Sequence, residues 1–163
     1  MRTAEGGEVS LFTYSKLVGY GTAIYQWDVV NRVTGGALQA GGTPGTTLWS
    51  GVALQYSPAS TAASIQVITA LTALYEAQDL DVSAGLTSSM PGQNANLKVS
   101  TAGSSTRPNL SGHGIDDSSV ATTSTLDLHL IQLYQDPTNA YGPYARFEVT
   151  FNKHRMAASV AGV

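Results

Sequence analysis

Two stretches near the end of the chain decide its fold: Leu126-Asp-Leu-His-Leu130 and Phe147-Glu-Val-Thr-Phe151. In both, apolar and polar residues alternate, which directs one set of side chains into a core and the other into solvent, as in a half-buried β-strand. The segment between them, Asp136-Pro-Thr-Asn-Ala-Tyr-Gly-Pro143, is rich in turn-forming residues. The pattern predicts an antiparallel hairpin with a long loop.

The apolar phase within this hairpin shifts after Leu130, so a β-bulge is predicted near Leu130 or Ile131. Upstream, three segments rich in β-branched and aromatic residues are further predicted strands: Val9–Tyr14, Tyr20–Val30 and Leu48–Tyr56. Short strands separated by Gly, Pro and Ser clusters are typical of a mainly β protein. We expect a single antiparallel β-sandwich domain over residues 1–163, with jelly-roll-like connections because the loops are long.

The segment 60–78 fits two structures. Ile65, Ile68, Leu71 and Tyr75 form one stripe of a helix that Ser60 would cap. The Val, Ile and Thr content of the same segment favours a strand, because β-branched side chains lose freedom in a helix. The apolar spacing of three and four makes one short helix the expectation here.

Long polar segments accompany the predicted strands. Residues 85–124 are mostly Ser, Thr, Gly and Asn and predict a long polar loop, interrupted by Leu97–Val99. Residues 1–8 form a predicted N-terminal arm, and the small residues 157–163 a predicted C-terminal tail. We expect the arm, residues 100–119 of the loop and the tail to reach neighbouring proteins.

The composition narrows the classes of function. Charged residues make up 12% of the chain, against about 25% in a typical protein, so its surface can be covered by other protein with few ions to desolvate. The basic residues are scattered and the net charge is −3, which argues against direct nucleic-acid binding. There is no cysteine for a disulfide or thiolate site. We expect neither a secretory signal at the N-terminus nor a membrane span.

Side chains that could bind a metal ion or take part in catalysis lie in and just before the polar segment. His113, Asp116 and Asp117, with Asp79 and Asp81 on a nearby predicted strand, offer oxygen and imidazole ligands for a cation. Asp beside Gly is more simply a turn former, and Ser111 lies too close in sequence to His113 to be oriented by it as a nucleophile. The sequence therefore predicts no catalytic residue, no metal site and no cofactor.

Two aromatic residues lie in the predicted hairpin loop, where no predicted core is available to bury them. Tyr141 and Tyr144 are candidate interface residues, since tyrosine is enriched where proteins meet. His113 and Asp116, in the polar loop, are further interface candidates. The alternative is a carbohydrate-binding β-sandwich, in which the two tyrosines would line up with Asp136 and Asn139.

In overall character the chain resembles the small cement or decoration proteins on the capsids of tailed bacteriophages. The resemblance is carried by the Ser/Thr/Ala/Gly-rich β-chain without cysteine, the long polar loop and the small-residue tail ending in Ala161-Gly-Val163. It implies a non-enzymatic homo-oligomer, with a trimer favoured over a dimer, that binds the major capsid protein at the virion surface after assembly in the host cytoplasm. Another phage part, such as a tail or head-completion protein, is a further alternative.

Overall fold

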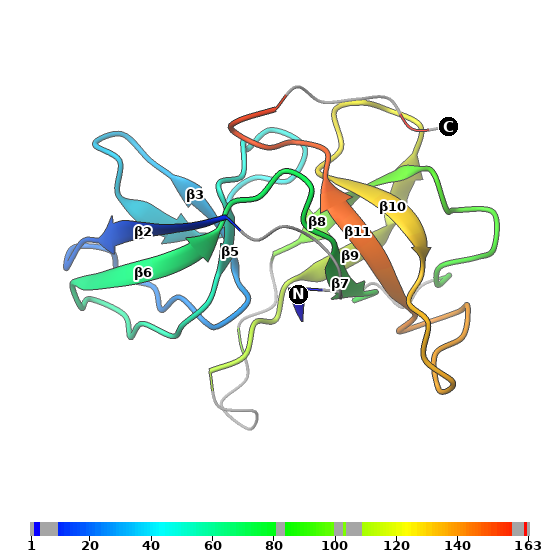
Figure 1. The fold of residues 1–163 in the computed structure, drawn as a ribbon, viewed down its shortest axis with the longest axis horizontal. Coiled ribbons are helices and arrows are strands. Elements are labelled where there is room, and N and C mark those ends of the chain that lie inside the picture. The colour runs from blue at the N-terminus through cyan, green and yellow to red at the C-terminus, as the bar shows by residue number, and fades with distance from the viewer. Residues whose placement is uncertain are drawn as a thin grey trace.

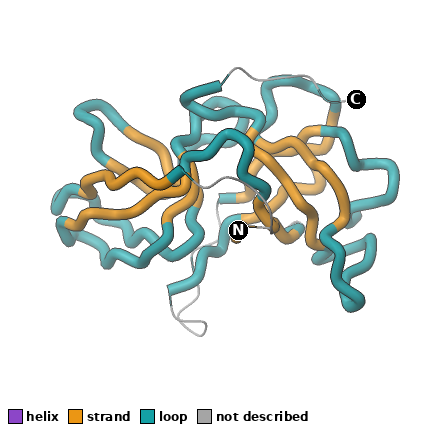
Figure 2. Tube along the Cα trace, in the orientation of Figure 1, coloured by secondary structure: helices purple, strands orange, loops and turns teal. Residues whose placement is uncertain are grey.

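The computed structural model describes residues 2–3, 10–80, 84–99, 103, 109–157 and 162. This part of the chain consists of strands and loops without a helix (Figure 2). The strands form two antiparallel sheets, which lie side by side along the long axis of the molecule (Figure 1). The architecture is consistent with the predicted mainly β sandwich.

One sheet has six strands in the order β1-β7-β11-β10-β8-β9. These are β1 (Arg2–Thr3), β7 (Tyr75–Gln78), β11 (Arg146–Phe151), β10 (Leu128–Leu133), β8 (Asn94–Lys98) and β9 (Gly114–Ala121). The other has five strands in the order β2-β6-β5-β3-β4. These are β2 (Leu11–Lys16), β6 (Ala63–Ile68), β5 (Gly51–Ala53), β3 (Val29–Arg32) and β4 (Leu38–Ala40). The jelly-roll order is not confirmed, because β3–β4, β8–β9 and β10–β11 pair as sequential hairpins.

The structure confirms the predicted C-terminal hairpin. Strands β10 and β11 pair antiparallel from Leu128↔Phe151 to Leu133↔Phe147, and their register shifts between Leu130 and Gln132, where the bulge was expected. The predicted strand Val9–Tyr14 corresponds to β2. Of the predicted strand Tyr20–Val30, only Val29 and Val30 lie in a strand, β3, which continues to Arg32. Of the predicted strand Leu48–Tyr56, Gly51–Ala53 form β5.

The predicted helix over 60–78 is wrong. Residues 63–68 form β6, which lies between β2 and β5, and residues 75–78 form β7 in the other sheet. Ile65 and Val67 are buried, while the intervening Gln66 is exposed. The β-branched residues therefore form a strand with a neighbour on each side, and the helical stripe is coincidental.

The predicted long loop over 85–124 is wrong in part. It contains β8 and the eight-residue β9, which pair with each other. Ile115 fills the core, and Asp117 accepts hydrogen bonds from the backbone N–H groups of Ala84 and Gly85. A strand with few apolar residues is stable here because its partners satisfy its buried polar groups.

Strands of the five-stranded sheet contribute side chains to two cores. Val29, Val52 and Ile68 point into a core shared with Leu128 and Phe147 of the six-stranded sheet. The residues adjacent to them point the opposite way into a second core: Val30, Ala53 and Val67, with Ile24, Leu38 and Ile65. Adjacent apolar residues in these strands thus serve different cores.

Asp127 joins the two sheets. Its carboxylate is fully buried and accepts hydrogen bonds from Trp49 Nε1 (2.9 Å), the Leu97 N–H (3.1 Å) and the Gly45 N–H (3.1 Å). Burial raises the pKa of Asp127, while these donors and the nearby Lys153 act to lower it. The donors come from β8 and from the 41–49 segment, so one side chain fixes the junction between the sheets.

The predicted arm and tail are described only in part. Arg2 and Thr3 form β1, whose backbone pairs with Glu76 and Tyr75 of β7. In the tail, the Ala157 N–H bonds to the His154 carbonyl and the Gly162 N–H to the Thr122 carbonyl. The other residues of 1–8 and 157–163 lie outside the described residues.

Candidate binding surfaces

His113 lies inside the chain. Its Nδ1 accepts a hydrogen bond from the Val29 N–H (3.1 Å), which sets the tautomer that directs Nε2–H toward Asp28 Oδ1, 3.7 Å away. Burial lowers the pKa of His113, and the charge of Asp28 partly opposes this. The Ser111 hydroxyl accepts the backbone N–H of His113 and does not meet its ring. This imidazole positions β3 against the 109–113 segment and is not a surface group.

The other acidic candidates take structural roles. Asp116 accepts a hydrogen bond from the Ser118 hydroxyl (2.6 Å) on the edge strand β9. Asp117 is buried beneath Ala84 and Gly85, and Asp79 is buried at a bridge to Ile115. Asp81 lies outside the described residues. Within the described part of the chain, no three His, Asp or Glu side chains gather as a metal site would require.

Tyr141 and Tyr144 form an exposed aromatic surface on the β10–β11 loop, here called the aromatic loop surface. Their exposed fractions are 45% and 59%. Tyr144 has a positive φ of 64°, a backbone conformation that a bulky residue rarely adopts. Glycine or asparagine would occupy this position with less strain. The sequence thus places a large aromatic side chain in solvent at an unfavourable position.

The aromatic loop surface is held rigidly. Gly142 exchanges two backbone hydrogen bonds with Leu86, and Tyr141 packs edge-on against Phe147 with the ring centroids 6.0 Å apart. Strain at an exposed side chain that the surrounding structure holds in place points to a function outside the fold.

The polar neighbours of these tyrosines are already engaged. Hydrogen bonds from Thr138 and then Arg146 lower the pKa of Asp136 to about 2. The Asn139 amide donates to the carbonyls of Tyr134 and Arg146 and accepts the Arg146 N–H. Asp136 and Asn139 therefore shape the loop, which weakens the case for them as sugar ligands.

A second apolar surface lies on β2 and the turn after it. It consists of Leu11, Phe12, Leu17 and Val18, each at least half exposed, and is called the β2 surface. This surface was not predicted from the sequence. The adjacent apolar pairs Leu11-Phe12 and Leu17-Val18 gave no signal, because both members of such a pair can face a core, as Val52 and Ala53 do.

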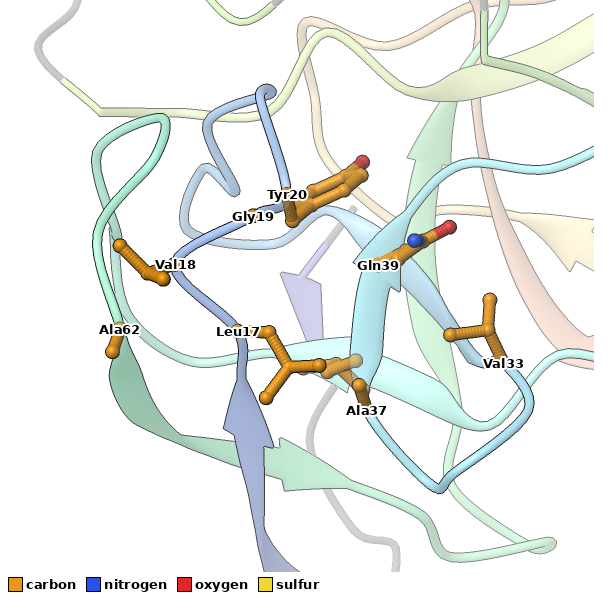
Figure 3. A pocket seen from close by; sticks show the side chains of 9 residues that line it. Leu17, Val18, Gly19, Tyr20, Val33, Ala37, Gln39 and Ala62 are labelled. Carbon is orange, nitrogen blue, oxygen red and sulfur yellow. The ribbon is translucent and has the colours of Figure 1, made fainter.

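The β2 surface continues into an apolar groove of about 580 Å³ (Figure 3). Leu17, Val18 and Tyr20 line one side of it. Val33, Ala37 and Gln39, from the β3–β4 hairpin, line the other. The Tyr20 hydroxyl donates to the Ala40 carbonyl (3.0 Å) and accepts the Ala40 N–H (3.1 Å), so it covers the outer edge of β4 at the end of the groove.

The aromatic loop surface and the turn after β2, with Leu17 and Val18, lie at opposite ends of the molecule. The start of β2 lies nearer the junction of the sheets, where Leu11 pairs with the buried Ile68. In Figure 1 the β10–β11 loop projects at the lower right, and β2 lies at the left. Comparison with protein-family models, characterised proteins and solved structures finds no match for this chain. In the described residues there is no helix of the length and hydrophobicity that would cross a membrane.

Proposed function

We propose that this chain is a non-enzymatic virion structural protein, which binds the outside of a phage capsid as a homo-oligomer and stabilises contacts between capsomers. The observation that carries this proposal is the presence of exposed apolar side chains at opposite ends of a β-sheet body: Tyr141 and Tyr144 at one end, and Leu17 and Val18 at the other. Large exposed apolar patches mark sites where proteins meet. A molecule with one such surface at each end is suited to joining two protein neighbours.

The roles of the polar residues support the same function. His113, Asp117 and Asp127, which could have served chemistry, are buried and bonded to backbone groups of other segments. Their arrangement stabilises the body of the protein. The low charged fraction of 12% further favours burial of the surface against protein.

The aromatic loop surface is the part of the molecule that we assign to the capsid shell. Tyrosine presents a large contact area while losing little conformational entropy on binding. Because the loop around Tyr144 is already fixed by its own hydrogen bonds, binding needs little further ordering. A rigid aromatic anchor of this kind is typical of an interface hot spot.

The test is Tyr144→Asn, which removes the aromatic ring and relieves the positive φ. We expect unchanged or slightly higher stability and at least about tenfold weaker binding, the loss typical of a hot-spot side chain. Binding is measured by co-sedimentation with expanded shells assembled from the major capsid protein of a tailed bacteriophage. Tail tubes from the same virus, used in parallel, distinguish a tail protein from a capsid protein.

Tyr56→Asn is the matched control. Tyr56 is 38% exposed and packs against Tyr25 away from the aromatic loop, so its replacement should leave shell binding unchanged. Equal binding by wild type and Tyr144→Asn would remove the loop from the interface. Failure of the wild type to bind shells, together with glycan binding that Tyr144→Asn abolishes, would replace the proposal with the carbohydrate-binding alternative.

A further inference from the structure

The outer edge of β2 is open to another strand at its start, around Leu11 to Thr13, whereas β4 lies close to its later part. β2 is the terminal strand of its sheet and pairs with β6 over six residues without a register shift. It has no proline, and its one charged residue, Lys16, is buried with Nζ donating to the Pro58 and Thr61 carbonyls. Proteins usually protect a sheet edge with charges, prolines or bulges, and β2 has none of these on its surface.

Of the other terminal strands in the described chain, β1 has only two residues, and the edges of β4 and β9 are covered in part. The Tyr20 hydroxyl occupies the edge of β4 at Ala40. At β9, the Leu80 N–H bonds to the Ile115 carbonyl, which bridges that edge back toward β7. The contrast singles out β2, where Leu11 and Phe12 are each about half exposed.

The hydrogen-bond phase of β2 makes its edge self-complementary. The Thr69 N–H donates to the Ser10 carbonyl, so the backbone groups of residues 10 and 12 face β6. Those of Leu11 and Thr13 consequently face outward. If two copies pair antiparallel about a two-fold axis at Phe12, each Leu11 meets Thr13 of the partner subunit. The two-fold axis produces two such pairs, and each pair exchanges two backbone hydrogen bonds, so this register permits four.

We propose that two copies of this chain associate through this edge, with β2 pairing antiparallel to β2 of the partner subunit and the two Phe12 side chains facing each other. The inference deepens the homo-oligomer part of the proposed function and rests on it. It selects the dimer, because antiparallel pairing of identical edges closes on itself after two subunits.

The side chains of β2 favour a second copy as the occupant. Directly opposed residues in the non-hydrogen-bonded pair approach closely, so the two Phe12 rings bury one another. No like charges meet, because Lys16 is buried. Two residues after Phe12, the Arg32 guanidinium lies over the Tyr14 ring at 5.0 Å. This neighbour from β3 restricts pairing to the part of β2 around Phe12.

The oligomeric state of the purified full chain tests the dimer, using light scattering and sedimentation velocity over a range of concentrations. The wild type should be a dimer. Phe12→Lys and Phe12→Glu should each weaken dimerisation at least about 100-fold, since like charges would oppose each other at the axis. An equimolar mixture of the two variants should restore the dimer, because opposite charges then meet there.

Ile131→Lys is the matched control, since Ile131 is a partly exposed apolar residue on β10, and it should remain dimeric. If the Phe12 variants do not fold, Thr13→Pro replaces them, because its lost N–H faces outward and not toward β6. A monomeric wild type, or a Phe12→Lys or Thr13→Pro protein that is still dimeric, would overturn the inference. So would a mixture of Phe12→Lys and Phe12→Glu that stays monomeric.

Different results would reject the capsid-binding function and the β2 dimer. A dimer that does not bind capsid shells would retain the β2 pairing and reject the capsid function. A monomeric wild type that binds shells through Tyr144 would retain capsid binding and reject the β2 dimer. A strand from a shell protein added to β2 would appear as shell binding by a monomer that Phe12→Lys abolishes.

Discussion

His113 is buried as a neutral imidazole that accepts the Val29 N–H, and protonation would remove this acceptor. Burial lowers its pKa in the folded state, so below about pH 6.5 the unfolded chain binds the proton more readily. The contribution of His113 to stability is therefore complete above the unfolded pKa and is lost as pH falls below it. His154, which accepts the Met156 N–H, has a pKa lowered by burial and acts in the same direction.

His113→Asn tests this dependence, since its amide oxygen can replace Nδ1 as the acceptor. We expect the loss of unfolding free energy between pH 7 and pH 5 to be about 1 kcal/mol smaller than in wild type, measured by urea unfolding at each pH. The raised pKa of Asp127 acts in the opposite direction, so only the difference between variant and wild type isolates His113. His129→Asn controls for loss of an imidazole, and equal losses in His113→Asn and wild type would contradict the prediction.

At the level of strands, local pattern predicts structure where each strand pairs with its neighbour in sequence. The β10–β11 hairpin and its bulge were predicted because alternation, turn residues and the phase shift all lie within 26 residues, Leu126 to Phe151. β6 was predicted as a helix because its partners, β2 and β5, are not visible in its own sequence. β9 was missed for the same reason, since long-range contacts bury Ile115 and satisfy Asp117.

The candidate surfaces divide in the same way. Tyr141 and Tyr144 could be identified because aromatic residues stand out in a polar turn. The β2 surface could not, because whether Leu11 and Phe12 face a core depends on where the six-stranded sheet lies relative to β2. The buried state of His113 depended equally on its contact with β3 across 84 residues.

Gly51 shows how closely two strands approach at the centre of the five-stranded sheet. Its φ is 138°, and a Cβ atom there would lie 1.9 Å from the Ile68 carbonyl oxygen. Gly51→Ala would force β5 away from β6, so we expect a loss of about 3 kcal/mol or more in unfolding free energy, measured by urea denaturation. Gly21→Ala has open space around its Cβ and should change stability by less than about 0.5 kcal/mol. Similar stabilities of the two variants would refute this account.

At the scale of the whole molecule, the arrangement of the two surfaces gives the dimer two capsid-binding sites. The β2 pairing uses the start of β2, which lies near the junction of the two sheets, and leaves the aromatic loop at the end of the six-stranded sheet free. A dimer can then engage two shell subunits at once, and the second contact forms at high effective concentration. Weak contacts at each Tyr144 would thereby give tight attachment, provided that the spacing of the loops matches that of the shell sites.

This coupling predicts that Phe12→Lys weakens attachment to shells although Phe12 does not touch them. We expect an apparent affinity about 100-fold lower than that of wild type, together with faster dissociation, measured by surface plasmon resonance on immobilised shells. Mixing Phe12→Lys with Phe12→Glu should restore slow dissociation. Adding Tyr144→Asn to both partners of that mixture should remove it again, because the dimer would re-form without its shell contacts. If the Phe12→Lys monomer dissociated as slowly as wild type, one aromatic loop would be sufficient for attachment and the bivalent mechanism would be wrong.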